Sequence, residues 1–166
     1  MNVVDRREQK ELLNKCWMTH DAMWFAHCLS EIGIERTNKI NRAAVRSMAL
    51  IEAKRVTKAL GIGKIETFDD FKKFYEGAME LVMPDFMDFT CTFPEHNLVH
   101  LEWGSCFAYN GVKQIGVIDK YKCGIFTRID GWLDSLAIEY SVTPHVEGCM
   151  MHTDGKCFRD YKLALK

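Results

Sequence analysis

The fold is decided by residues 87–103, which read MDFTCTFPEHNLVHLEW. Apolar and polar side chains alternate along residues 87–93 and again along 99–103, which is the period-two pattern of half-buried strands. The segment between them, residues 94–97, reads PEHN and is rich in residues that favour turns. These residues therefore predict an antiparallel β-hairpin near the middle of the chain.

The chain before this hairpin predicts helices. Apolar side chains recur at helical spacing in four segments, residues 6–17, 20–32, 35–60 and 68–82. Thr19 is the expected cap of the second helix, and Gly33 and Gly61 are the expected stops of the second and third. Thr67 and Asp70 have the spacing of a capping box at the start of the fourth helix.

The chain after the hairpin returns to helical spacing in residues 111–140. Pro144 begins an expected last hairpin, whose turn contains the dipeptide at 154–155, Asp-Gly. Cys149 and Cys157 then fall on opposite arms of that turn. We therefore expect an α+β fold in which N-terminal helices pack on an antiparallel sheet that ends in a cysteine-bearing hairpin.

Composition supports one domain over residues 1–166, mainly helical in 1–83 and carrying the hairpin, helix and cysteine-bearing hairpin in 84–166. Hydrophobic residues make up 48% and charged residues 27%, and the net charge of −1 predicts no nucleic-acid or anionic membrane partner. No apolar run approaches the ~18 residues of a membrane span, and no apolar signal region opens the chain. We therefore expect a cytoplasmic protein. Its oligomeric state stays open, a homodimer included.

The C-terminal cysteines predict a metal site, so the last hairpin is expected to be metal-bearing. The chain has seven cysteines, and reduced thiols in the cytoplasm favour metal binding or catalysis over disulfides. Cys149 and Cys157 can face one point, and the helix after Cys123 returns to the same hairpin, where Glu147 or His145 could supply a fourth ligand. These ligands suit tetrahedral zinc, whereas thiolates also suit iron or an iron–sulfur cluster. Alternatively, the thiols are small buried apolar residues.

Four segments, three of which carry a cysteine, resemble the C-terminal half of 4-vinyl-reductase-like domains, which include the phenol-sensing domains of bacterial transcription activators. They are CG at 123–124, IDGWLDSL at 129–136, EGC at 147–149 and GKCF at 155–158. The resemblance implies one zinc held by Cys123, Cys149 and Cys157, with Glu147 near the place of the family's acidic ligand. It also implies a sensor-like domain that binds a small molecule.

Two other segments resemble a family of uncharacterised bacterial and archaeal proteins, some of whose relatives are named L-2-amino-thiazoline-4-carboxylate hydrolases. They are DAMWF at 21–25 and the segment 106–123. That family's four C-terminal cysteines match Cys123, Cys149, Cys157 and also Cys106, which becomes a further candidate for the fourth ligand or for a reactive thiol. The resemblance implies an alternative function, a metal- or cysteine-dependent hydrolase acting on a C–N or thiazoline-type bond.

Polar and aromatic side chains predict a ligand pocket. The candidate ligand-binding residues are His20, Asp21, Trp24, His27, Trp103 and Trp132. His20 and His27 lie seven residues apart and share a helix face, where they could orient a ligand or serve as a general base and its partner. We expect a cavity of about a few hundred Å³ for a small apolar or aromatic molecule. Alternatively, His20 is a surface residue, His27 is a satisfied core histidine, and the aromatic side chains simply pack the core.

Overall fold

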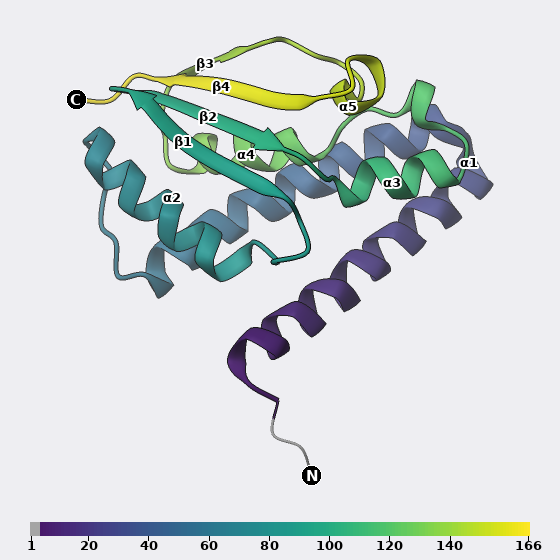
Figure 1. Cartoon of the computed structure of the whole chain (residues 1–166), viewed down its shortest axis with the longest axis horizontal. Helices are drawn as coiled ribbons and strands as arrows, with labels where there is room; N and C mark the ends of the chain where they lie inside the picture. The colour runs from purple at the N-terminus through teal and green to yellow at the C-terminus, as the bar shows by residue number, and fades with distance from the viewer. Residues whose placement is uncertain (1–3) are drawn as a thin grey trace.

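The computed structural model describes residues 4–166 as a four-stranded antiparallel sheet with α1, α2 and α4 on one side of it (Figure 1). This arrangement confirms the predicted α+β fold. The helices are α1 (Arg6–Ala59), α2 (Phe68–Val82), α3 (Phe107–Gln114), α4 (Ile125–Ser135) and α5 (Met150–Thr153), with a 3-10 helix at Ile118–Lys120. The strands are β1 (Phe89–Glu95), β2 (Leu98–Trp103), β3 (Tyr140–Thr143) and β4 (Cys157–Leu163), in the order β1-β2-β4-β3.

The predicted hairpin is confirmed as β1 and β2, with Phe89 opposite Trp103 and a turn at Asn97, whose φ is 62°. Leu101 and Trp103 are buried on the side that the helices cover, whereas Glu102 is exposed on the other. The capping box of Thr67 is also confirmed at the start of α2. The sheet therefore presents one apolar face to the helical layer, as the alternation of its residues predicts.

Helix α1 is two helical arms joined at Gly33, whose φ of 73° and ψ of 169° interrupt the helix. We call residues 6–32 the first arm and residues 34–59 the second arm. Figure 1 shows the chain turning between them and running back, so that the arms form a V. Gly33 and Gly61 are confirmed as breaks, but the expected cap at Thr19 is wrong. The helix runs through Thr19 because neither a glycine nor a proline interrupts the chain there.

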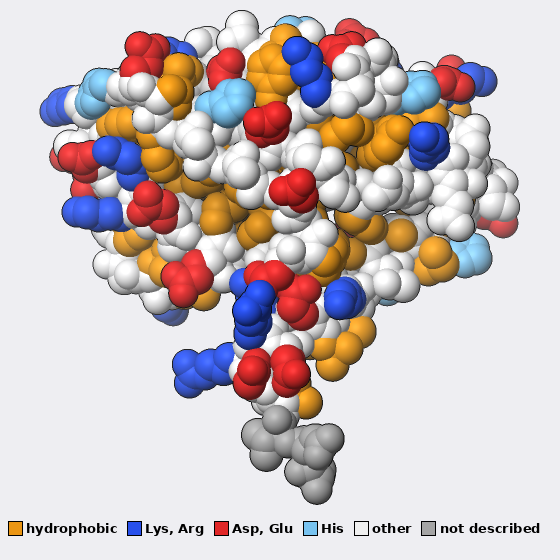
Figure 2. All heavy atoms as spheres, viewed as in Figure 1, with side chains coloured by type: hydrophobic (Ala, Val, Ile, Leu, Met, Phe, Trp, Pro, Cys, Tyr) orange, Lys and Arg blue, Asp and Glu red, His pale blue; other side chains and the backbone are white. Residues whose placement is uncertain are grey.

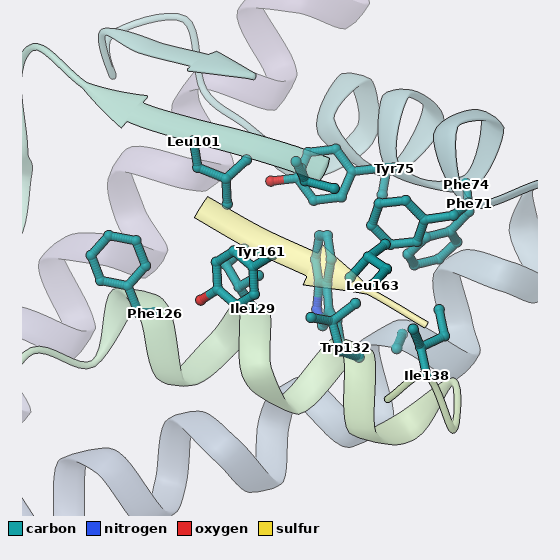
Figure 3. Packing of buried hydrophobic residues seen from close by; sticks show 14 of the residues in the cluster. Phe71, Phe74, Tyr75, Leu101, Phe126, Ile129, Trp132, Ile138, Tyr161 and Leu163 are labelled. Atoms are coloured by element: carbon teal, nitrogen blue, oxygen red, sulfur yellow. The ribbon is translucent and has the colours of Figure 1, made fainter. Parts of the chain in front are cut away.

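The core lies between α2, α4 and the sheet. Figure 3 shows Phe71, Phe74 and Tyr75 of α2 beside Trp132 of α4 and Tyr161 of β4. The ring of Trp132 meets the rings of Phe74 and Tyr75 edge to face, at centroid distances of 5.9 and 6.3 Å. These aromatic side chains therefore fill the core, each pair adding about 0.5–1.5 kcal/mol beyond its buried area.

An ion pair ties α1 to α4. Arg128 of α4 donates two hydrogen bonds to the carboxylate of Glu52 on the second arm, and Trp132 Nε1 donates a third at 2.8 Å. The guanidinium also lies over the ring of Trp17 on the first arm, 5.3 Å from its centroid. The second arm and α4 also approach each other closely at Gly131, where an added Cβ would lie 2.7 Å from the Cβ of Ala49. Both arms are thus held by one half-buried arginine.

Two predictions about the C-terminal half are wrong in detail. The single helix expected over residues 111–140 is instead α3, the 3-10 helix, α4 and the start of β3. The last hairpin is formed by β3 and β4, but residues 144–156 make a long connection that contains α5 rather than a tight turn. Gly155, with a φ of 69°, follows α5 and leads into β4. Cys149 therefore lies on a helix start and not on a strand.

The surface drawn in Figure 2 mixes Lys and Arg side chains with Asp and Glu side chains, and the start of the first arm projects from the body there. Near that start, Arg7 pairs with Asp85 at 2.5 Å, and Lys10 donates to the carbonyl oxygen of Glu80. Within residues 4–166, every helix is too short or too polar to traverse a lipid bilayer.

Candidate functional site

Four cysteines line one small cavity in the C-terminal half: Cys106, Cys123, Cys149 and Cys157. Its volume is about 10 Å³, which is the space that one water molecule or one ion occupies. The other walls include the aromatic side chains of Trp103, Tyr121 and Phe126 and the buried side chain of Arg159. The fold thus brings together the three cysteines predicted as ligands and, as a fourth, Cys106.

The four thiols reach this cavity from separate elements. Antiparallel pairing of β2 with β4 sets Trp103 opposite Cys157, the first residue of β4. The chain leaves β2 just before Cys106, which begins α3, and Cys149 begins α5 in the same way. Cys123 stands one residue ahead of the cap of α4. Three of the four cysteines therefore lie at or next to the N-terminal end of a helix.

Helix starts direct backbone N–H groups toward these thiols. At each of these three helix starts, two backbone N–H groups act to lower the pKa of the thiol. They belong to Ala108 and Tyr109 at Cys106, to Ile125 and Phe126 at Cys123, and to Met151 and His152 at Cys149. The side chains of Cys106 and Cys149 nevertheless form no capping hydrogen bond. The N–H groups therefore favour the thiolate form electrostatically, as helix N-termini do.

Burial outweighs these N–H groups. Desolvation is the main cause that raises the pKa of all four thiols, to about 11 for Cys123 and about 12 for Cys157. The thiols also raise one another's pKa, since each would be a negative charge near the others. Four neutral thiols are therefore expected at neutral pH unless a cation enters the cavity and compensates their charge.

Arg159 is a buried cation beside the cysteines. Its side chain is 5% exposed and lies over the ring of Phe126, 4.4 Å from the centroid. Its terminal nitrogens donate to the carbonyl oxygens of Pro144 and Val146, whereas its Nε finds no acceptor among residues 4–166. The same described residues offer it no carboxylate within ion-pair distance. Arg159 lowers the pKa of Cys157, so it favours negative charge in the cavity.

The expected ligand Glu147 is not brought to the cysteines. Its carboxylate is exposed and accepts a hydrogen bond from Lys122 Nζ at 3.1 Å. Glu147 and His145 instead line a second cavity of about 280 Å³, which shares Cys123, Phe126 and Arg159 with the first. In the chain from residue 4 onward, no three side chains of His, Cys, Asp or Glu are already set as metal ligands. The four thiols surround their cavity without forming such a group.

The predicted ligand-binding residues are not brought together. His20, Asp21, Trp24 and His27 are exposed on the first arm, where Trp24 Nε1 donates to His20 Nε2 at 3.0 Å. Trp132 is buried in the core, and Trp103 lines the cysteine cavity. Hence these six residues do not form a common pocket. The first arm also exposes other apolar side chains, Leu12, Leu13 and Met23, and a homodimer stays a prediction.

Sequence reasoning missed Arg159, Arg42 and Lys122, which line the cavities. A signal for Arg159 was present, because buried and less buried residues alternate along β4 and Arg159 lies in phase with Tyr161 and Leu163. An arginine at an inward position of a strand is costly to bury and therefore points to a site. No comparable signal marks Arg42 on its exposed helix face.

Comparison with known proteins gives one match. Residues 6–83 match the model of a family of unknown function, DUF6125. The matched segment covers α1 and α2 and ends before the first cysteine of the cavity. Neither a curated protein nor a solved structure matches the chain. The match therefore concerns the helical layer, and any function of the cysteine cavity has to be argued from its own residues.

Proposed function

We propose that this chain is a small-molecule-binding, sensor-like domain in which Cys106, Cys123, Cys149 and Cys157 hold one structural zinc ion. The observation that carries the proposal is the convergence of four thiols from four separate segments on a single cavity of about 10 Å³. Four thiolates are a common ligand set of structural zinc, and such sites have no open coordination position. The ion would link the starts of α3, α4 and α5 to β4.

The surroundings fit a negatively charged metal–thiolate group. Four thiolates around Zn²⁺ carry a net charge of −2, and a buried guanidinium would offset part of it. Arg159 is such a group, since its Nε has no acceptor among the described residues. The N–H groups at the helix starts favour thiolates as well. A cavity near the size of one ion favours zinc or a single iron over an iron–sulfur cluster.

The small-molecule part of the proposal rests on the cavity of about 280 Å³ beside the cysteines. That volume lies just below the usual range of small-ligand sites, which begins near about 300 Å³. The cavity shares three residues with the cysteine cavity, so the zinc would fix one wall of the ligand site. This ligand site takes the place of the pocket predicted from His20, Asp21, Trp24, His27, Trp103 and Trp132, which the fold does not bring together.

A hydrolase is the weaker proposal. It needs either an open metal position or a reactive thiol beside a base. Burial raises the pKa of Cys106, which makes it a poor nucleophile at neutral pH. The described residues that line its cavity include no histidine, aspartate or glutamate. Cys106 therefore has the features of a metal ligand rather than those of an activated thiol.

Metal analysis tests the zinc site. Protein purified without chelator should contain about one zinc per chain, and Cys157→Ser should lose most of it. Cys16→Ser is the matched control, because Cys16 is exposed on the first arm and should keep the full zinc content. Cobalt(II) substitution of the wild type gives a second measurement that does not depend on a variant folding, since tetrahedral thiolate coordination has a recognisable absorption spectrum.

Three results would contradict the zinc site. They are a zinc content unchanged by Cys157→Ser, a zinc content lost equally in Cys16→Ser, and wild-type protein that takes up neither zinc nor cobalt. Iron together with acid-labile sulfide would instead show that the thiols hold an iron–sulfur cluster.

A further inference from the structure

We propose that the cavity of about 280 Å³ binds a small molecule that carries an oxyanion, a carboxylate or a phosphate, on an apolar body. The proposal rests on the proposed function in that it names the ligand class of a small-molecule-binding domain, but it does not require the metal. Three cations from three elements line the cavity: Arg42 of the second arm, Lys122 ahead of α4, and Arg159 of β4. The sequence predicted a small apolar or aromatic ligand, and we expect that ligand to carry an acidic group as well.

The cavity is lined by more arginine and lysine side chains than carboxylates that could pair with them. Arg42 and Arg159 make no ion pair with any residue that the structure describes, and only Lys122 is paired, with Glu147. The other acidic residue of the lining is Asp130, whose carboxylate already accepts a hydrogen bond from the Tyr161 hydroxyl at 2.9 Å. An entering oxyanion would therefore meet unpaired guanidinium groups, which bind carboxylate and phosphate with paired hydrogen bonds.

The position of Arg159 strengthens this inference. A buried charge without an ion-pair partner is unfavourable. This guanidinium contacts carbonyl oxygens and an aromatic ring, and Asp130 interacts with it electrostatically without forming an ion pair. Arg159 borders both cavities, so it can face thiolates on one side and a ligand oxyanion on the other. The cavity thus combines positive charge held in the protein interior with Arg42 near the solvent.

The remaining walls define the rest of the ligand. Phe126, Val142 and Val146 are apolar and line the same cavity as the three cations. Most small-ligand sites have this composition, in which apolar walls hold the body and a few polar groups fix the orientation. The volume accommodates a single ring with one acidic substituent. A purely cationic ligand would face Arg42, Lys122 and Arg159 and is disfavoured.

Phenyl phosphate and benzoate are suitable probes, with benzyl alcohol and benzylamine as neutral and cationic controls of similar size. Each is titrated into the full-length protein as purified, whatever its metal content, and binding is followed by the amide shifts of residues 122–130 and 142–147 in NMR spectra. We expect at least one of the two anions to bind at least about tenfold more tightly than benzyl alcohol, because a charge-assisted hydrogen bond discriminates by that amount or more. Comparing the two anions distinguishes phosphate from carboxylate.

Arg42→Met tests the residue assignment, and Arg36→Met is the matched control, because Arg36 is exposed on the same arm but does not line the cavity. Arg42→Met should weaken the binding of the preferred anion by about tenfold, and Arg36→Met should not. Both variants should keep their zinc, so a failure here is distinguishable from a failure of the metal site. The inference is overturned if neither anion saturates below about 10 mM, if benzyl alcohol or benzylamine binds as tightly, or if the two variants behave alike.

Discussion

The helical layer, made of α1, α2 and α4, and the cysteine-bearing region, residues 104–124 and 144–159, use different means to stay folded. In the helical layer, long helices pack through aromatic and aliphatic side chains, and Arg128 of α4, paired with Glu52, joins α4 to the two arms of α1. In the cysteine-bearing region, residues 104–124 and 144–156 contain only short helices and connections. Together with the start of β4, they hold the four thiols of the cavity and Arg159, a buried arginine without a carboxylate ion-pair partner among the described residues.

This difference shows which part of the molecule depends on something beyond its own side chains. The helical layer satisfies its charges internally, since Glu52 of the second arm pairs with Arg128 of α4 and also accepts the indole N–H of Trp132. The cysteine-bearing region leaves Arg159 Nε without an acceptor among the described residues. A metal bound by the four thiols would supply both the missing charge balance and the cross-links between connections.

Removal of the metal should have the largest effect. Zinc in small structural sites contributes about 10–16 kcal/mol of apparent binding energy, which becomes folding energy for the segments it joins. We therefore expect a strong chelator to lower the melting temperature by at least about 10 °C. Hydrogen exchange should locate the loss, with protection falling in residues 104–124 and 144–157 and persisting in α1 and α2.

The control for chelation is Cys16→Ser, which should lose stability with chelator as the wild type does. Untreated Cys157→Ser should instead resemble the chelated wild type. An unchanged melting curve after proven metal removal would show that the metal is not structural. If chelation lowered exchange protection evenly over the whole chain, the metal would not stabilise the cysteine-bearing region more than the helical layer.

A smaller effect is expected from Glu52→Gln in the helical layer. The variant leaves the Arg128 guanidinium mostly buried, with 19% of its side chain exposed, and removes its negative partner. Breaking such a pair costs about 3 kcal/mol. Urea unfolding should show this loss both with and without chelator, because the ion pair lies in the helical layer and the zinc would join the cysteine-bearing region.

The matched control is Asp134→Asn, which breaks the more exposed pair of Arg46 and Asp134. Its side chains are 50% and 31% exposed, so the loss should stay below about 1 kcal/mol. Equal losses in the two variants would mean that burial of Arg128 adds nothing to the strength of its ion pair. A loss from Glu52→Gln that disappears with chelator would mean that the helical layer and the cysteine-bearing region are not independent.

The sequence predicted local features of the fold well and distant contacts poorly. The hairpin of β1 and β2, the capping box at Thr67 and the breaks at Gly33 and Gly61 depend on residues close together in the chain. The single helix over residues 111–140 failed because its apolar spacing continues on both sides of Gly116, which has a φ of 76° and follows the end of α3 as Gly61 follows the end of α1. No spacing rule predicts that β4 inserts between β2 and β3.

The site shows the same limit. The sequence was enough to group Cys123, Cys149 and Cys157. It did not predict how the fold brings them together, because Cys149 lies at a helix start and not on a hairpin arm. Cys106 joins them because the register of β2 against β4 sets Trp103 opposite Cys157, which is a long-range contact. Arg159 could have been noticed from its inward phase in β4, whereas Arg42 could not.

The smallest expected effect is that of Asp130→Asn, which concerns the charge balance of the ligand cavity. Burial raises the pKa of Asp130 above its ordinary value of 3.8, so the charged form is favoured more in the unfolded chain than in the folded one. At neutral pH, Asp130→Asn should therefore raise the free energy of unfolding by up to about 1 kcal/mol, because Asn still accepts the Tyr161 hydroxyl. The gain should shrink as the pH falls and vanish below 3.8, where the carboxyl is neutral in the folded and in the unfolded chain. The same variant removes a negative charge from the cavity, so it should bind phenyl phosphate more tightly than the wild type does. Weaker binding, or a stability gain that grows at low pH, would show that Asp130 is not an uncompensated charge in this cavity.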